Sequence, residues 1–327
     1  MLRLPAFDLH EPKSLEEALA LLLEHGGDAM PIAGGTDLLP NMKHELFTPK
    51  VLVSLSGIAS LRTVEDLGHA WRLGAGCTLD QLANHPGVQE SLPALAEALG
   101  AVGGPHHRRM GTLGGNLCLD TRCLYYNQTY QWREALGFCL KKDGDVCHVA
   151  GGRKCVAAAS NDSAPPLLVY DATVEIVGPQ GARSLPVREF YHPDGISNTR
   201  LEAGELVVAL LVSKPKQRTR AAFHKLRRRG AIDFPLLNMA VLLRCDDQGA
   251  LVELSAAVSA LAARPNLVKG LDRFLGQVPD QALIEAIADR CRRGSVPLTN
   301  LATDPEWRRA MVPVFIRRLL ERCLDVE

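Results

Sequence analysis

The chain has 327 residues, of which 46% are hydrophobic and 23% charged, so it can bury a core and is not predicted to be disordered. Its 37 acidic residues balance its 37 basic residues, which excludes the strongly basic character typical of proteins that bind nucleic acid or anionic membranes. The sequence shows no signal-peptide core and no run of roughly 18–20 apolar residues that could cross a bilayer, so we expect a cytoplasmic protein.

The N-terminal residues alternate between helix and strand signals. Residues 14–17 (SLEE) form a capping box, which predicts a helix that extends to about residue 24. A short apolar strand over residues 30–33 runs into two glycines, and a helix over residues 36–45 and a strand over residues 51–55 follow. This β-α-β-like unit is predicted to form a small subdomain of its own.

From Trp71 the pattern restarts in a second and longer part of the chain. A strand beginning at Trp71, a helix cap at Thr78 and a helix over residues 91–102 precede a glycine-rich turn and a segment rich in cysteine. Strand patterns return over residues 166–177 and 205–212.

A charged segment without apolar periodicity, residues 213–220, is predicted to be a linker. Beyond it, three strand patterns precede three helical patterns, which predicts helices on one face of an antiparallel sheet. The strands are expected over residues 221–226, 238–244 and 251–261, and the helices over residues 265–275, 280–293 and 305–323. We therefore expect an α+β protein with a domain of residues 1–215, divided into subdomains 1–56 and 57–215, and a smaller α+β domain of residues 216–327.

Two glycine loops stand out, residues 31–38 (PIAGGTDL) and residues 112–116 (TLGGN). Glycine allows positive φ angles and close approach to a ligand, and a helix that begins after such a loop offers free N–H groups to a phosphate. Neither loop has the G-x-G-x-x-G or Walker spacing. Each alone is typical of an ordinary turn, whereas the pair would suit a pyrophosphate held from two sides.

Five of the nine cysteines lie between residues 118 and 155, which in a chain without a secretion signal favours metal ligation over disulfides. Four of them are widely spaced, as Cys123-x15-Cys139-x7-Cys147-x7-Cys155. Four thiolates can ligate a [4Fe–4S] cluster, whereas structural zinc sites usually pair their ligands as C-x₂₋₄-C. We favour the cluster, with a zinc site and free thiols as the alternatives. The scattered cysteines are interpreted as buried apolar residues: Cys77, Cys245, Cys291 and Cys323.

The same segment contains six basic residues, Arg122, Arg133, Lys141, Lys142, Arg153 and Lys154, against four acidic ones. They are interpreted either as a mixed surface or as a patch that receives an acidic ferredoxin. We find no arrangement of nucleophile, base and acid, so no catalytic residue is predicted and substrate chemistry is expected on another chain.

The segments PIAGGTDLLP, LGAGCTLDQLA, RRMGTLGGNL and FHKLRRRGAIDFPLLNMAVLL, in this order, resemble the FAD-binding medium subunits of the molybdenum hydroxylase family, which includes xanthine oxidase and carbon monoxide dehydrogenase. The resemblance covers nearly the whole chain and implies a two-subdomain FAD-binding fold of the PCMH type with a C-terminal domain that closes over the flavin. Without it, Lys225 would be interpreted as a solvated strand end. The resemblance implies FAD contacts from Pro31, Ile32, Ala33, Gly34, Gly35, Thr36, Asp37, Leu38, Val102, Thr112, Leu113, Gly114, Gly115, Asn116, Asp162, Val207 and Lys225.

The segments TLGGNLCLDTRCLYYNQ and FCLKKDGDVCHV, with the residues before Cys155, are similar to one branch of this family, the β subunits of 4-hydroxybenzoyl-CoA reductases. That resemblance implies a [4Fe–4S] cluster held by Cys123, Cys139, Cys147 and Cys155 in an insertion over about residues 117–160, with Cys118 outside the ligand set. Flavin subunits of periplasmic-type aldehyde oxidoreductases also carry an inserted cluster, but their cysteine segment is less similar.

The branch implies ferredoxin-dependent reductive dehydroxylation of 4-hydroxybenzoyl-CoA to benzoyl-CoA, in the catabolism of aromatic compounds. It also implies a dimer of heterotrimers, with a large subunit that binds the molybdenum cofactor and a small subunit that binds two [2Fe–2S] clusters. Two alternatives stay open. One is the flavin subunit of an oxidising hydroxylase that acts on an aldehyde or an N-heterocycle, and the other is a zinc-stapled scaffold without redox function.

Overall fold

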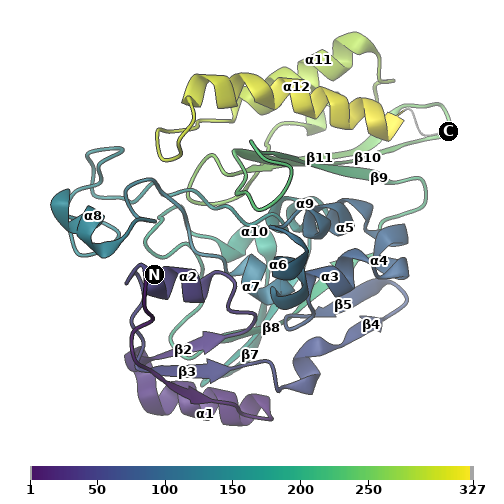
Figure 1. Ribbon diagram of the computed structural model, residues 1–327. Helices are drawn as coiled ribbons and strands as arrows, with labels where there is room; N and C mark the ends of the chain where they lie inside the picture. Colours follow the sequence, from purple (N-terminus) through teal and green to yellow (C-terminus); the bar gives the residue numbers. More distant parts are fainter. Residues whose placement is uncertain (1, 325–327) are drawn as a thin grey trace.

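The structure is a computed structural model that describes residues 2–324. Its first sheet is parallel, with strand order β1-β3-β2 (Figure 1). The Ser14 hydroxyl accepts a hydrogen bond from the Glu17 N–H at 3.2 Å and begins the first helix as predicted. The second helix is shorter than predicted, and beyond it Glu45 takes a positive φ of 57°. The elements of this unit are β1 (Asp8–His10), α1 (Leu15–His25), the 3₁₀ turn η1 (Gly26–Asp28), β2 (Ala29–Ile32), α2 (Leu38–Lys43) and β3 (Val51–Ser54).

The second sheet is antiparallel and has strand order β4-β5-β8-β6-β7. Its strands are β4 (Val64–Asp66), β5 (Ala70–Gly74), β6 (Thr173–Gly178), β7 (Gly181–Pro186) and β8 (Leu206–Ser213), and the 3₁₀ turn η2 (Ala59–Arg62) precedes them. The helices between them are α3 (Leu79–Ala83), α4 (Pro86–Ser91), α5 (Pro93–Gly100), α6 (Pro105–Met110), α7 (Leu113–Leu117), α8 (Tyr130–Ala135), α9 (Ala164–Val169) and α10 (Val187–Phe190).

The helix expected over residues 91–102 is present as α5, which begins at Pro93 because proline suits the first turn and restricts the residue before it. One prediction for this region was wrong because of proline. The strand expected over residues 166–177 starts only at Thr173. The residues before it form α9, in whose first turn Pro165 and Pro166 are tolerated because no N–H is needed there.

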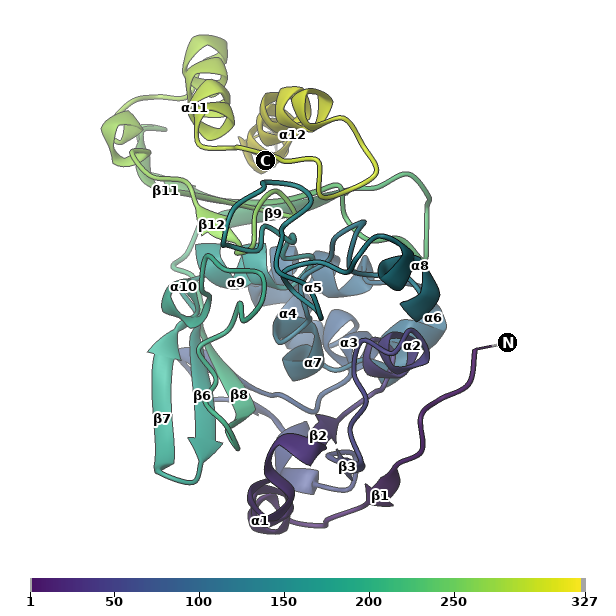
Figure 2. The same ribbon diagram turned by 90° about the vertical axis from the view of Figure 1, so that its left-hand side faces the viewer.

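The third sheet is antiparallel, with strand order β12-β11-β10-β9. The helix predicted over residues 265–275 is absent, because Asn266 and Leu267 pair with β11 and a 3₁₀ turn follows. Helices α11 and α12 cover one face of this sheet, and α5 and α9 pack against the other (Figure 1, Figure 2). The elements are β9 (Arg220–Leu226), β10 (Leu237–Cys245), β11 (Leu251–Ser259), β12 (Asn266–Leu267), η3 (Asp272–Phe274), α11 (Gln281–Arg293) and α12 (Pro305–Leu324).

One hydrophobic core extends from the second sheet to the third. It contains Leu73 and Leu210 of the second sheet, Leu99 of α5, and Phe223 and Leu242 of the third sheet. A second core fills the space between the third sheet and the helices α11 and α12. No helix within residues 2–324 is long and apolar enough to cross a membrane.

Candidate flavin and metal site

The two predicted glycine loops lie against each other. A Cβ at Gly34 would collide with the backbone of Met110 and Gly111, just before the second loop. The Thr112 hydroxyl caps α7 by accepting a hydrogen bond from the Gly115 N–H at 3.1 Å. Gly35 has a φ of +66°, as expected for a glycine turn. The fold therefore brings together two segments that lie about eighty residues apart in the sequence.

The glycines have different surroundings. A Cβ at Gly114 would lie 2.7 Å from the Cβ of Ala75, so this position needs glycine for packing inside the protein. Gly115 is exposed, and its added Cβ would meet only the hydroxyl of Thr112, at 3.0 Å. Gly115 is therefore the glycine of the second loop that faces open space.

A buried polar group lies beyond the second loop, at the junction with the third sheet. The Asp162 carboxylate accepts hydrogen bonds from Lys225 Nζ at 2.7 Å and from Asn238 Nδ2 at 2.8 Å. The next residue, Ser163, donates its N–H to Asn116 Oδ1 at 3.0 Å, which joins this group to the glycine loop. Burial raises the pKa of the Asp162 carboxyl, and the Lys225 ammonium opposes this effect. Lys225 is thus a buried partner of Asp162, and the solvated strand end is excluded.

Two other predicted positions, Val102 and Val207, have different surroundings. Val102 is partly buried beside the core, and its carbonyl accepts a hydrogen bond from Arg108 at 3.1 Å. The neighbouring carbonyl of Ala101 accepts from Lys225 at 3.2 Å. Val207 is 7% exposed and packs into the shared core from β8. Val102 is therefore near the buried polar group, whereas the environment of Val207 is that of a core residue.

Asp37 connects the first glycine loop with the cysteine segment. Its carboxylate accepts from Arg122 at 3.3 Å and from the Asn41 amide at 3.0 Å. Burial raises the pKa of Asp37 to about 6, and the Arg122 guanidinium partly offsets this shift. The same guanidinium lies 3.6 Å from the ring centre of Phe234, in the loop that follows β9. Arg122 therefore joins three separate parts of the chain.

The cysteine segment leaves and re-enters the fold at one narrow point, where Arg122 and Ala158 exchange two backbone hydrogen bonds of 2.8 Å. Its helix α8 lies at the edge of the molecule (Figure 1). Arg133 on α8 is 1% exposed and donates to the carbonyls of His44 and Glu45 at 3.1 Å each. These contacts fix the segment to the end of α2.

The C-terminal part of the chain also holds the cysteine segment. The Asn300 side chain donates to the carbonyl of Val156 at 2.6 Å, and the Asn300 carbonyl accepts from the Leu124 N–H at 3.0 Å. Asn300 in turn lies beside the fully buried Arg308 of α12. The segment is therefore fixed both to the first unit and to the last helix.

Four thiols of this segment influence one another. Burial raises the pKa of the Cys123 thiol to about 11, and the thiols of Cys155, Cys139 and Cys147 raise it further. Cys139, Cys147 and Cys155 are buried, and Cys123 is partly buried. Cys118 lies elsewhere, beside the core, and its pKa of about 12 reflects burial alone. Within residues 2–324, no three His, Cys, Asp or Glu side chains meet at the spacing of ligands to a single metal ion.

The basic residues of the segment do not form one patch. The side chains of Arg133 and Lys141 are 1% and 4% exposed, and Arg122 is mostly buried against Asp37. Only Lys142, Arg153 and Lys154 remain more open to solvent. Three of the six basic side chains therefore make contacts inside the protein, and Lys142, Arg153 and Lys154 are the ones left open for a docking surface.

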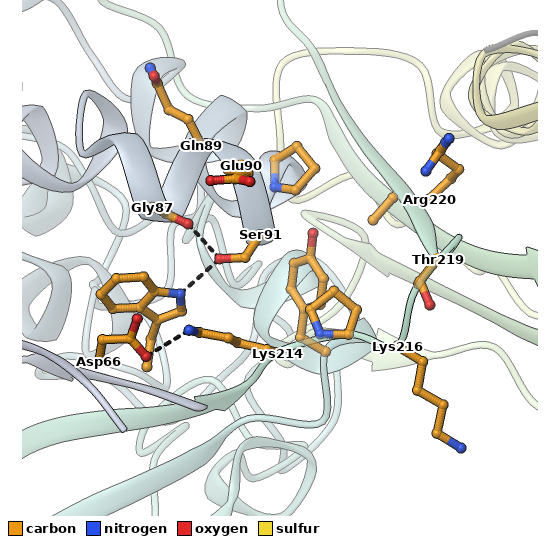
Figure 3. A pocket seen from close by; sticks show the side chains of 14 residues that line it. Asp66, Gly87, Gln89, Glu90, Ser91, Lys214, Lys216, Thr219 and Arg220 are labelled. Carbon is orange, nitrogen blue, oxygen red and sulfur yellow. Dashed lines mark hydrogen bonds and ion pairs between the residues drawn. The ribbon is translucent and has the colours of Figure 1, made fainter. Parts of the chain in front are cut away.

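A cavity of about 660 Å³ lies elsewhere, beside the linker between β8 and β9 (Figure 3). Trp71 donates its indole N–H to the Ser91 hydroxyl at 2.7 Å, and Lys214 pairs with Asp66 at 2.6 Å. None of the residues predicted to bind a cofactor lines this cavity.

Sequence reasoning missed three residues that organise the site. Asn238 fixes Asp162, Arg122 fixes Asp37, and the buried Lys141 pairs with Asp120 in the cysteine segment. Asn238 has one readable signal, a polar residue at the start of an otherwise apolar strand. Arg122 and Lys141 have none, because a basic residue in a polar loop is indistinguishable from a solvated one.

Comparison with known families matches two models to this chain. Residues 5–215 match the FAD binding domain in molybdopterin dehydrogenase, and residues 221–323 match the CO dehydrogenase flavoprotein C-terminal domain. The chain belongs to the family of FAD-binding subunits of molybdenum hydroxylases. As a flavin subunit of this family it is part of an oxidoreductase.

Individual relatives agree with this assignment. The medium chain of carbon monoxide dehydrogenase from Afipia carboxidovorans is 29% identical over 97% of this flavin subunit and 96% of its own length. The FAD-binding subunit of aldehyde oxidoreductase from Escherichia coli is 32% identical over 75% of this chain and 79% of its own. The solved carbon monoxide dehydrogenase from Hydrogenophaga pseudoflava superposes with a TM-score of 0.81 at 26% identity, covering 98% of this chain and 97% of that one.

Proposed function

We propose that this flavin subunit carries both FAD and a [4Fe–4S] cluster and transfers electrons within a molybdenum enzyme. The observation that carries the proposal is the group of four thiols, Cys123, Cys139, Cys147 and Cys155, which are buried or partly buried in one segment, with Cys123 and Cys139 in the same packed cluster. The group is attached to the first glycine loop through Arg122 and Asp37. A second redox centre would therefore lie close to the flavin.

FAD fits the paired glycine loops. The exposed Gly115 leaves room for a pyrophosphate to approach the second loop closely. Asp162, Lys225 and Asn238 would present a fixed polar surface beyond the loop, toward the flavin end of the cofactor. When bound, FAD supplies the chemistry that accepts and passes on electrons. We propose that the predicted residues contact FAD, Val102 and Val207 included.

A four-iron cluster fits the donor set. Each iron takes one cysteine, so four thiolates arranged around a cluster need not converge on one point. A metal ligand must be deprotonated, and burial among like groups raises the thiol pKa. A cluster of iron ions would reverse that effect, because its positive charge stabilises the thiolates.

Iron and sulfide analysis of the anaerobically purified protein tests the cluster. We expect about four iron and four sulfide per chain, and loss or degradation of the cluster when serine replaces any one of the four ligands. Cys118→Ser is the matched control, since this thiol lies in the same segment but faces the core. Stoichiometric zinc, or a cluster that survives all four substitutions, would disprove the proposal.

For the substrate we propose 4-hydroxybenzoyl-CoA, reduced with electrons from a ferredoxin. The support is the similarity of the cysteine segment to that reductase branch. A low-potential cluster would suit a demanding reduction, because cluster potentials extend to about −700 mV. The second candidate is oxidation of an aldehyde, favoured by the 32% identity to the aldehyde oxidoreductase subunit. A large subunit with the molybdenum cofactor, a small subunit with two [2Fe–2S] clusters and a dimer of heterotrimers are proposed for either reaction, in the cytoplasm.

Turnover by the assembled complex distinguishes the two candidates. The reductase should consume 4-hydroxybenzoyl-CoA with reduced ferredoxin or a viologen dye, and the oxidase should consume an aldehyde with an electron acceptor. Ferredoxin-driven turnover should fall with salt, because the Debye length shrinks from about 10 Å at 0.1 M to roughly 3 Å at 1 M. Turnover of the aldehyde alone would exclude the reductase.

A further inference from the structure

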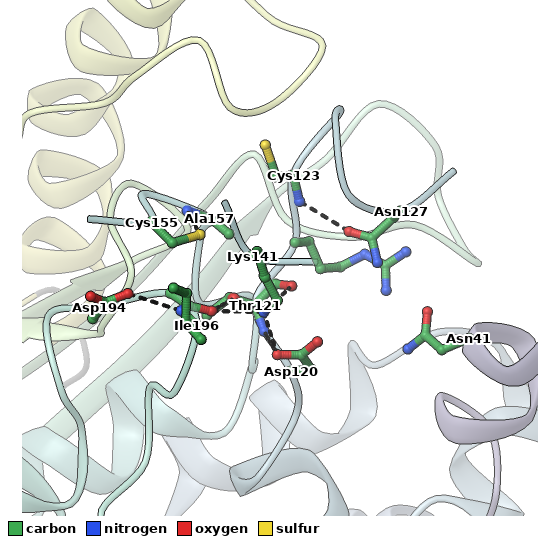
Figure 4. Close-up of polar contacts among 12 residues, drawn as sticks. Asn41, Asp120, Thr121, Cys123, Asn127, Lys141, Cys155, Ala157, Asp194 and Ile196 are labelled. Carbon is green, nitrogen blue, oxygen red and sulfur yellow. Dashed lines mark hydrogen bonds and ion pairs between the residues drawn. The ribbon is translucent and has the colours of Figure 1, made fainter. Parts of the chain in front are cut away.

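Lys141 is a buried cation in a polar loop. Its ammonium donates hydrogen bonds to Asp120 Oδ1 and to the Thr121 hydroxyl at 2.5 Å each, and to the Gly195 carbonyl at 2.7 Å (Figure 4). It also lies 4.5 Å from the ring centre of Tyr126. With its side chain 4% exposed, the charge is held in one place and is poorly screened by water.

The ammonium is connected to one of the four thiols through the backbone. The Gly195 N–H donates to the carbonyl of Cys155 at 2.9 Å, and a Cβ at Gly195 would lie 2.9 Å from Cys155 Sγ. Of the charged side chains, Lys141 has the strongest influence on the Cys155 thiol. It also acts on Asp37 of the first glycine loop, so its charge reaches both predicted redox sites.

The partner of Lys141 is partly buried and is also fixed. Asp120 Oδ1 accepts from Lys141 and from the Thr121 N–H, and the Tyr126 hydroxyl lies close to the same carboxylate. Lys141 donates to the Gly195 carbonyl, and the Gly195 N–H donates to the carbonyl of Cys155. The two charges therefore form a fixed pair whose positive member is the one connected to the thiol group.

We propose that the charges of the Lys141–Asp120 pair set the reduction potential of the iron–sulfur cluster. The inference rests on the proposed cluster at Cys123, Cys139, Cys147 and Cys155. Reduction by one electron adds a negative charge to the cluster and its thiolates. A fixed cation nearby favours the reduced state, and a fixed anion opposes it. Removal of either partner should therefore shift the potential in a direction set by its charge.

The experiment is a potentiometric titration of the holoenzyme with dithionite, in which the reduced cluster is followed by electron paramagnetic resonance. Lys141→Met should lower the equilibrium constant for reduction roughly tenfold, or about 59 mV for one electron. Asp120→Asn should shift the potential upward, and the double variant should lie between the two single variants. Lys142→Met is the matched control, because this neighbouring side chain is 34% exposed and its charge is screened, so a smaller shift is expected.

The opposite signs separate this role from a structural one. A purely structural pair would make both single variants lose iron or shift alike, and either result would overturn the inference. If Lys141→Met loses its cluster, the upward shift expected for Asp120→Asn still decides the matter. Unchanged potentials in variants that retain four iron would refute the inference and leave the proposed function intact. Wild-type protein without iron would refute both.

Discussion

At the scale of single residues, the site depends on which atoms face open space. Gly34 and Gly114 are required by neighbouring protein atoms, so a valine at either position would damage the fold as well as the cofactor site. Gly115 is the informative position, since an added side chain would project outward from the loop.

Gly115→Val should therefore lower the FAD content of the purified protein at least tenfold, while the unfolding transition of the flavin-free chain changes little. Helix propensity does not oppose this change, because valine is a better helix former than glycine. Flavin absorbance per chain measures the first quantity, and urea unfolding measures the second. Gly100→Val is the control, because this glycine lies in α5 with nothing within 4 Å of an added Cβ. Full FAD occupancy in the Gly115 variant would exclude the close approach of a pyrophosphate to this loop.

The raised pKa of Asp37 should make the stability of the chain depend on pH. Its folded-state pKa of about 6 lies above the ordinary value of 3.8, so the native state binds this proton more tightly than the unfolded state. The stabilisation is complete below pH 3.8 and is lost as the pH rises through about 6. Relative to Asp37→Asn, the wild type should therefore lose about 1–2 kcal/mol of unfolding free energy between pH 4 and pH 6.5, a value that allows for partial solvent screening.

Urea unfolding of the flavin-free proteins at several pH values measures this difference. Asp8→Asn is a suitable control, since this side chain lies in an exposed position on β1. A difference between wild type and Asp37→Asn that stays constant, or that grows with pH, would contradict the raised pKa.

At the scale of elements, features that depend on neighbouring residues could be predicted from the sequence, and features that depend on tertiary contacts could not. The caps at Ser14 and Thr78 begin helices as their sequences indicate, because a cap involves only the next three residues. The strand β12 was missed because two residues become a strand only by pairing with β11. The proximity of the two glycine loops was predicted from the family resemblance, whereas the internal neutralisation of Arg122 and Lys141 was not, since their acidic partners are set by tertiary structure.

The short helix α8 should depend on Arg133 for its attachment. Arg133→Met removes the donors to two backbone carbonyls at the end of α2 and leaves those carbonyls unsatisfied, a loss of about 1–3 kcal/mol. We expect faster cleavage between residues 124 and 154 in limited proteolysis, with FAD retained. Arg153→Met should cleave at the wild-type rate, because that side chain is exposed. Equal cleavage rates for all three proteins would show that α8 is held by other contacts.

At the scale of the whole molecule, the continuous core couples the segments matched by the two family models. Phe223 and Leu242 from the third sheet are buried in the same core as Leu99 of α5 and Leu73 of the second sheet. A core shared in this way predicts cooperative unfolding of the whole chain, although the third sheet follows a linker.

Calorimetry of the flavin-free chain should therefore show one transition. Leu242→Ala should lower the stability of the entire chain by about 2–5 kcal/mol, because it opens a cavity in the shared core. Leu9→Ala, at a position 54% exposed, should leave the transition unchanged. Two separated transitions, with only one of them sensitive to Leu242→Ala, would show that the two parts unfold independently.

The shared core also limits how this chain can be recombined with its relatives. A chimera that takes residues 221–323 from another flavin subunit would place foreign β9 and β10 side chains against α5 and α9 of this chain. Foreign side chains at this contact would have to fit the volume and shape of the core that they replace. The unit that can be grafted is therefore the third sheet together with α5 and α9, three segments that are far apart in the gene. A crossover at the linker alone would divide the shared core between two parent sequences.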